Sequence, residues 1–101
     1  MKGSVSIMKF AMSGEELARL TEALRANDDC EEAGDGSFIV DLYEPEPAVS
    51  LELYIEKGGI AITAVGLLSY SKELDGWYMS DRIEDKEGIA AVFARLKEAF
   101  L

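Results

Sequence analysis

Residues 49–62 read VSLELYIEKGGIAI, and this stretch decides the fold. In the first eight residues, apolar side chains alternate strictly with polar or amphipathic ones. This period of two is typical of a strand in an antiparallel sheet that is covered on one face only. The Gly58-Gly59 pair predicts a tight hairpin turn, because primed turns require positive φ. We therefore expect a β-hairpin with one buried face and one wet face.

The turn also predicts how the two strands are paired. With Gly58 and Gly59 as the loop, Lys57 lies opposite Ile60. Every apolar inner residue of one strand then meets an inner residue of the other. On the wet face, the same register places Tyr54 opposite Thr63.

Two helices are predicted outside this hairpin. The first begins at SGEE, residues 13–16, which is a capping box: the serine hydroxyl and the second glutamate's carboxylate satisfy free amides at the helix start. An apolar stripe at helical spacing follows and ends near Asn27. The second helix can be capped by Asp85 and carries an apolar stripe almost to Leu101.

Further strands are predicted from shorter patterns. Alternation predicts strands over residues 4–12 and 37–43. Residues 27–36, which lie between the first helix and the second of these strands, are rich in acids and glycine and are expected to form a polar loop. Asp75-Gly76 predicts a second hairpin turn within residues 71–76, followed by a short strand over residues 77–79.

Together these elements predict an α+β fold, a two-layer sandwich. We expect an antiparallel sheet of four to five strands with two helices on one face, in the order β-α-β-β-β-(β)-α. The amphipathic helices and the one-sided sheet can bury each other's apolar surfaces by stacking. The 101 residues show no linker or shift in composition, so we expect residues 1–101 to form a single α+β domain.

The composition excludes several classes of function. The chain has 20 acidic residues, 10 basic residues and no histidine, and its formal net charge is −10. Such a field repels nucleic acid and anionic membranes, so we expect no direct nucleic-acid or membrane binding. The lack of histidine removes the usual general base and the commonest metal ligand. We expect a protein that is not an enzyme and has no cofactor.

Residues 28–35 contain a secondary acidic patch around Cys30. Clustered carboxylates suit calcium, but the spacing does not follow the calcium-loop pattern, so we expect a solvated patch and no metal. Carboxylates nearby raise the pKa of a thiol, and no histidine is present to act as base, so Cys30 is not expected to be a nucleophile. The acidic patch consists of Asp28, Asp29, Glu31, Glu32 and Asp35.

The wet face of the sheet is the main candidate binding surface. It combines acids with tyrosines, and tyrosine offers a large rigid contact area with a polar tip. An ordinary solvated face, a homodimer face and a docking site for a basic partner all remain open. Trp77 and Tyr78 form a second candidate anchor, although we expect Trp77 to pack in the core. The candidate partner-binding residues are Glu52, Tyr54, Glu56, Thr63, Tyr43 and Asp41, with Val65 and Leu67 on the same face.

One family resemblance points in the same direction. SLEL at residues 50–53, GIAI at residues 59–62, Gly66-Leu67 and the terminal amphipathic helix resemble the C-terminal part of WapI-type bacterial immunity proteins. The resemblance implies a small, acidic, non-catalytic protein that neutralises a toxin. It carries over no binding residues.

Our leading hypothesis is an acidic inhibitor or immunity protein, bacterial or from a phage, that binds a basic protein partner. That partner would be a toxin or a nucleic-acid-handling complex, and an inhibitor that mimics DNA belongs to the same physical class. The alternative is a structural or regulatory homodimer that associates through the open sheet face. A lone cysteine and the lack of a signal-like apolar start predict a cytoplasmic protein. The sequence leaves open whether Met1 or Met8 is the native start.

Overall fold

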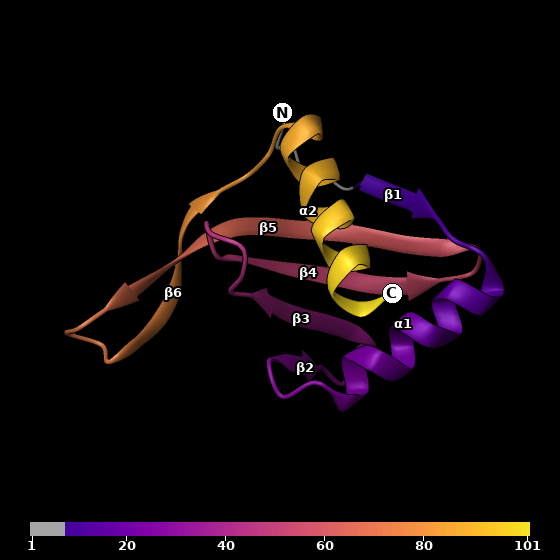
Figure 1. Cartoon of the computed structure of the whole chain (residues 1–101), viewed down its shortest axis with the longest axis horizontal. Helices are drawn as coiled ribbons and strands as arrows, with labels where there is room; N and C mark the ends of the chain where they lie inside the picture. The colour runs from indigo at the N-terminus through magenta and orange to yellow at the C-terminus, as the bar shows by residue number, and fades with distance from the viewer. Residues whose placement is uncertain (1–7) are drawn as a thin grey trace.

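The computed structural model describes residues 8–101 and confirms the α+β class. It contains a six-stranded antiparallel sheet and two helices (Figure 1), so the expectation of four to five strands was too low. The part of the predicted first strand at residues 4–7, and the choice between the two candidate starts, concern residues outside the described range. The elements are β1 (Met8–Ala11), α1 (Gly14–Ala26), β2 (Cys30–Glu32), β3 (Ser37–Leu42), β4 (Val49–Glu56), β5 (Gly59–Ser71), β6 (Gly76–Arg82) and α2 (Lys86–Phe100).

The sheet is organised around its longest strand. Its order is β1-β5-β4-β3-β2, and β6 also pairs with β5. The 13 residues of β5 are enough for β1 to pair with its first part and β6 with its last part, both on the edge away from β4. As a result, the β5–β6 hairpin projects beyond the rest of the sheet (Figure 1).

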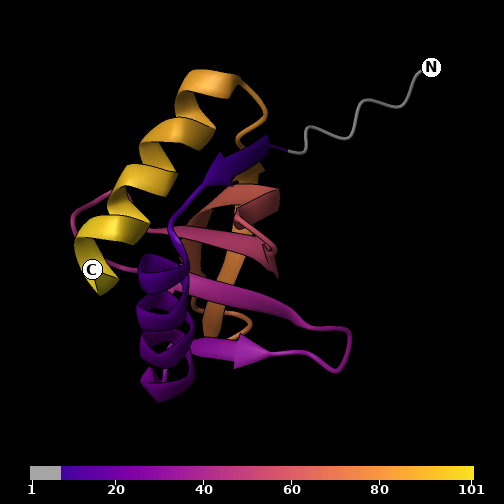
Figure 2. The ribbon, with the colours of Figure 1, turned by 90° about the vertical axis from the view of Figure 1, so that its right-hand side faces the viewer.

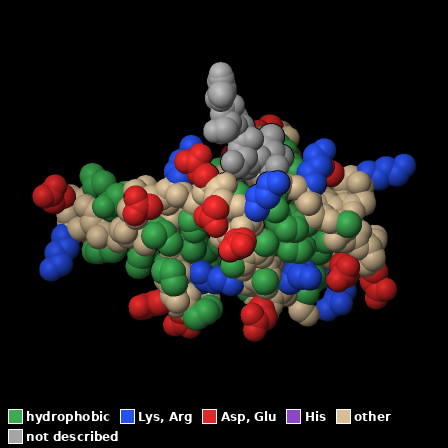
Figure 3. Space-filling view, turned by 90° about the horizontal axis from the view of Figure 1, so that it is seen from above, with side chains coloured by type: hydrophobic (Ala, Val, Ile, Leu, Met, Phe, Trp, Pro, Cys, Tyr) green, Lys and Arg blue, Asp and Glu red, His purple; other side chains and the backbone are tan. Residues whose placement is uncertain are grey.

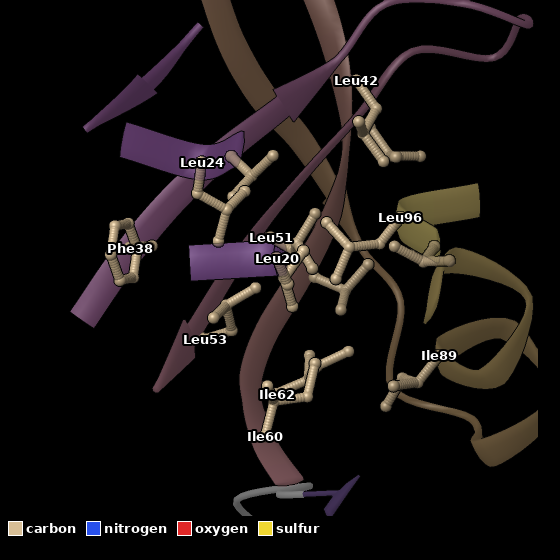
Figure 4. Close-up of a cluster of buried hydrophobic side chains, with 14 of the residues drawn as sticks. Leu20, Leu24, Phe38, Leu42, Leu51, Leu53, Ile60, Ile62, Ile89 and Leu96 are labelled. Carbon is tan, nitrogen blue, oxygen red and sulfur yellow. The ribbon is translucent and has the colours of Figure 1, made fainter. Parts of the chain in front are cut away.

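Both helices lie on the same face of the sheet, and within residues 8–101 no helix or strand covers the opposite face (Figure 2). We call that opposite face the outer face. Leu20 and Leu24 of α1 and Ile89 and Leu96 of α2 point toward the strands (Figure 4). The strands contribute buried residues that alternate along the inner face, including Phe38, Val40, Leu42, Val49, Leu51, Leu53, Ile60 and Ile62.

The start of α1 is the predicted capping box. The Ser13 hydroxyl accepts a hydrogen bond from the Glu16 amide at 3.1 Å, and the Glu16 carboxylate accepts one from the Ser13 amide at 3.1 Å. The helix ends at the predicted position, with Asn27 as its C-cap. Phe10 of β1 stacks on Phe93 of α2 with ring centroids 4.1 Å apart, which ties the first strand to the last helix.

The predicted register of the β4–β5 hairpin was wrong, because the two-residue loop lies one residue earlier in the chain than predicted. Glu56 pairs with Gly59, so the loop is Lys57-Gly58, and Gly58 has the positive φ of +84°. Gly59 lies in the strand instead. A Cβ at Gly59 would overlap the carbonyl oxygen of Phe10, so glycine is needed there for the close approach of β1.

A β-bulge overturns the predicted faces of β5. Leu53 pairs with Ile62, but Glu52 pairs with Ala64, which leaves Thr63 as the extra residue. An extra residue reverses the alternation beyond it. Val65 is therefore buried in the core, and Leu67 packs against the core rather than lying on the wet face as predicted.

Candidate functional site

The outer face brings together several of the predicted binding residues. Three adjacent rows cross it, because Ser37 pairs with Tyr54, Ile39 with Glu52, and Asp41 with Ser50. The β5 residues that pair with Tyr54, Glu52 and Ser50 are small: Ala61, Ala64 and Gly66. The larger side chains in these three rows of the outer face therefore come from β3 and β4.

The polar tips on this face are bonded to neighbours in the same chain. The Tyr54 hydroxyl donates to Asp35 Oδ2 at 3.0 Å. The Thr63 hydroxyl donates to Glu52 Oε1 at 2.7 Å, which ties the bulge to the next strand. These bonds hold the two carboxylates in fixed positions.

The remaining predicted residues lie at the two ends of the face. Glu56 forms an ion pair with Lys9 of β1 at 3.5 Å. At the other end, the Tyr43 hydroxyl donates to Asp41 Oδ2 at 3.4 Å. Burial, together with Asp41 and Asp29, raises the pKa of Tyr43. The six predicted residues thus form a strip across the sheet, and Tyr43 is the member nearest the β5–β6 hairpin.

The acidic patch does not remain one polar loop. Residues 30–32 form the edge strand β2, and Glu32 makes a double hydrogen bond with Arg25 of α1, both at 3.0 Å. The bond to Arg25 lowers the pKa of Glu32. Asp35 instead accepts bonds from Ser37 and Tyr54, which lower its pKa. The structure therefore joins Asp35 to the outer face. Glu31 lies within β2 and pairs with Ile39 of the outer face, while the exposed acids Asp28 and Asp29 precede β2.

Cys30 lies at the start of β2 and is half-buried. Burial, followed by the charges of Asp29 and Asp41, raises the pKa of its thiol to about 11. The sequence predicted the direction from the carboxylates, but burial is the larger cause. The thiol is therefore protonated at neutral pH.

Cys30 is expected to resist alkylation in the folded protein. At pH 8 its thiolate fraction should be about a hundredfold below that of an ordinary cysteine, and the thiolate is the reactive form. Iodoacetamide labelling followed by mass spectrometry measures the rate. The same chain in urea is the control, because unfolding removes the burial, which is the largest cause, and separates Cys30 from Asp41. Equal rates in the two conditions would contradict the raised pKa.

The β5–β6 hairpin carries five of the six exposed large hydrophobic side chains of the described residues. Trp77 and Tyr70 are each 50% exposed, so the expectation that Trp77 packs in the core was wrong. Figure 3 shows this hairpin as the arm on the left, with hydrophobic side chains between charged ones. We call the group the hairpin patch; it consists of Tyr70, Leu74, Trp77, Tyr78 and Met79.

The aromatic rings of this region contact one another edge to face. Trp77 lies 5.2 Å from Tyr43 at 65° and 5.7 Å from Tyr70 at 68°. The Tyr70 hydroxyl donates to Asp75 in the hairpin loop at 2.7 Å. Through Tyr43, the hairpin patch is continuous with the predicted strip on the outer face.

A hollow of about 610 Å³ opens beside Trp77, and we call it the aromatic hollow. One wall is the β3–β4 loop. The sequence predicts this loop only as a break between two strands. Arg95 of α2 holds this loop by donating to the carbonyl oxygens of Pro45 and Pro47. The lining residues are Tyr43, Glu44, Pro45, Glu46 and Trp77.

The sequence contained a partial signal for this region. Trp77 and Tyr78 beside a turn marked the hairpin as a candidate anchor, but Glu44 and Glu46 were missed. Their position in the same hollow as Trp77 depends on how the loop folds back onto α2, and no local pattern encodes that. The long β5, which carries the hairpin away from the helices, was also missed.

Residues 8–101 contain neither a metal site nor a membrane-spanning helix. No group of three or more histidine, cysteine, aspartate or glutamate side chains there is arranged to hold a metal ion. Within the same range, neither helix has the length and apolar character needed to cross a membrane.

Comparison with known proteins does not assign this chain to a family. No family model, no curated protein and no solved structure matches it.

Proposed function

We propose that this chain is a non-catalytic acidic binding protein that inhibits or neutralises a basic protein partner. The hairpin patch is the observation that carries the proposal. It gathers five of the six exposed large hydrophobic side chains of the described residues on one projecting hairpin. Exposed apolar groups gathered in one place mark interaction sites more often than scattered ones do.

The residue types of the patch suit a protein interface. Tryptophan, tyrosine and methionine are enriched in interface cores and supply most of the binding energy when buried. The hairpin projects from the sheet, so a partner can surround it without displacing either helix (Figure 1).

The charge of the chain selects the partner. A net charge of −10 raises the rate of encounter with a basic protein and opposes encounter with an acidic one. Acids also lie next to the patch, at Glu44 and Glu46 in the hollow and at Glu73 and Asp75 in the hairpin loop. Apolar anchors with an acidic rim fit a basic, partly apolar surface.

The resemblance to WapI-type immunity proteins makes a nuclease toxin the specific partner class that we propose. A nucleic-acid-handling complex bound by a DNA-mimicking phage inhibitor has the same surface chemistry. The alternative is a homodimer through the outer face, which no helix or strand of the described residues covers (Figure 2). Light scattering separates these proposals, since a homodimer has twice the 11.1 kDa mass of the chain.

Replacing Trp77 by alanine is expected to weaken partner binding by about 30-fold, because a central buried tryptophan commonly contributes about 2 kcal/mol or more. The partner is first isolated from bacterial lysate on the immobilised chain at low and at moderate salt. The purified partner is then titrated with the wild-type and Trp77→Ala chains by calorimetry. We expect a basic protein whose affinity falls with salt, and whose nuclease activity, if it is a toxin, is inhibited.

Ile39→Ala is the matched control, because Ile39 is 40% exposed on the outer face and away from the hairpin. It should change the affinity by less than about threefold. If Ile39→Ala weakens binding as much as Trp77→Ala, the interface is the sheet face. If the isolated partner is acidic, or if its affinity is independent of salt, the proposal is wrong.

A further inference from the structure

We infer that the aromatic hollow is a receptor for one arginine side chain of the basic partner. This inference rests on the proposed function and deepens it, because it names the group that the partner inserts. The hollow combines two aromatic rings with two carboxylates. That is the chemistry a guanidinium group requires.

The two rings form walls that meet at a steep angle. Tyr43 and Trp77 are inclined at 65° to one another, with centroids 5.2 Å apart. Trp77 stays 50% exposed although two tyrosines contact it. A cation within about 6 Å of an indole centroid is attracted by the negative face of the ring. The exposed part of Trp77 therefore offers the stronger of the two cation-binding walls.

The two carboxylates have no cationic partner within residues 8–101. The ion pairs in that range join Lys9 to Glu56 and Arg25 to Glu32, and they do not involve Glu44 or Glu46. Both glutamates are exposed and line the same hollow as Trp77. An incoming cation would therefore gain charge-assisted hydrogen bonds without breaking an existing ion pair.

The wall that carries these glutamates is already in place. Arg95 Nη1 donates to the Pro47 carbonyl oxygen at 2.7 Å, and Nη2 donates to that of Pro45. At the end of the loop, the Leu68 amide donates to the Ala48 carbonyl oxygen at 2.9 Å. Because the loop is fixed from both α2 and β5, little ordering remains to oppose binding. Arg95 is a positioning residue, since its Nη1 and Nη2 atoms both donate to backbone carbonyls of the loop.

Arginine fits better than lysine for two reasons. Its planar guanidinium stacks on an aromatic ring and at the same time presents forked donors to carboxylates. It is also more weakly hydrated than an ammonium group, so it loses less on leaving water. A hollow lined by two aromatic residues and two glutamates uses both properties.

The test uses the full chain and the peptide acetyl-Gly-Arg-Gly-amide. The chain has one tryptophan, Trp77, so its fluorescence reports directly on the hollow. Amide shifts in ¹H–¹⁵N spectra locate the site independently. We expect millimolar-range binding, with shifts at Tyr43, Glu44 and Glu46. The citrulline peptide, which has the same shape without the charge, should bind about fivefold or more weakly, and the lysine peptide should also bind more weakly.

Two double variants separate a site from general attraction. Glu44→Gln/Glu46→Gln should weaken binding of the arginine peptide about fivefold or more. Glu22→Gln/Glu84→Gln removes the same charge from exposed positions outside the hollow and should change binding by less than about twofold. Arg95→Met should reduce binding without removing either wall residue, while Arg95→Lys should restore part of it.

Equal binding of the arginine and citrulline peptides would overturn the inference. So would equal effects of the two double variants, because binding would then follow net charge alone. If a basic partner depends on Trp77 but the arginine peptide does not bind, the proposed function stands and only this inference fails. If the peptide binds and no basic partner is found, the proposed function fails instead.

Discussion

Leu51→Ala is expected to lower the free energy of unfolding by about 2–5 kcal/mol, a large part of the about 5–15 kcal/mol typical of a small domain. Leu51 is 0% exposed and lies in β4, next to the long central strand β5. The cost has two parts, the lost transfer of the side chain from water and the cavity that remains. Urea unfolding followed by circular dichroism measures the change.

The cavity at Leu51 should not close, because its neighbours are fixed on both sides. It pairs with Val40 of β3 and Val65 of β5, both of which are buried, and it belongs to the same buried cluster as Leu20 of α1 (Figure 4). Leu74→Ala is the matched control, since Leu74 is 74% exposed in the hairpin loop. It should change stability by less than about 0.5 kcal/mol. A similar loss in both variants would show that Leu51 is not a central core residue.

Gly59→Ala is expected to cost about 2–3 kcal/mol by separating β1 from β5. The added Cβ would overlap the Phe10 carbonyl oxygen, which is backbone and cannot move by a change of rotamer. The hydrogen bond from the Met12 amide to the Gly58 carbonyl oxygen, 2.9 Å long, lies beside this contact and should weaken. Urea unfolding gives the free energy, and hydrogen exchange at the Met12 amide reports whether β1 has separated.

Gly34→Ala makes the same chemical change in open space. Its added Cβ would have no neighbour within 4 Å, and its φ is not in the left-handed region. It should change stability by less than about 1 kcal/mol, in the stabilising direction, because alanine restricts the unfolded chain. A Gly59→Ala chain as stable as the wild type, with Met12 still protected, would mean that β1 does not approach β5 as described.

The helices were predictable because their signals are local. Ser13 and Glu16 satisfy amides within the same turn, so four adjacent residues contain the whole capping box. The apolar stripe of α1 likewise needs no partner to be recognised, and its end at Asn27 agreed with the structure. Interactions between residues a few positions apart decide such elements, and these interactions can be recognised from the sequence.

The β4–β5 turn was mispredicted because two local solutions looked alike. Both Gly58 and Gly59 accept positive φ, and moving the loop by one residue keeps the inner residues of the two strands on the same face. Alternation therefore could not distinguish the two registers. The close approach of Phe10 decides between them, since it requires glycine at residue 59 within the strand.

The bulge at Thr63 left a readable signal that alternation alone hid. Ile60, Ile62, Val65 and Leu67 are spaced by two, three and two residues, and that pattern itself marks one extra residue. By contrast, β2 had no such signal. Three mostly acidic residues become a strand because β3 offers its free edge and Arg25 neutralises Glu32.

The sequence by itself determined the α+β class, both helices, the acidic charge and the alternation of inner and outer residues along β3 and β4, because these depend on composition and on neighbours within a few positions. Only the tertiary structure decided that Trp77 is exposed and that Glu44 and Glu46 line the same hollow. The first follows from the length of β5, which carries the hairpin beyond the helices. The second follows from Arg95, 48 residues along the chain from Pro47, which holds the loop against α2. Contacts over such separations depend on the assembled fold, and no local pattern records them.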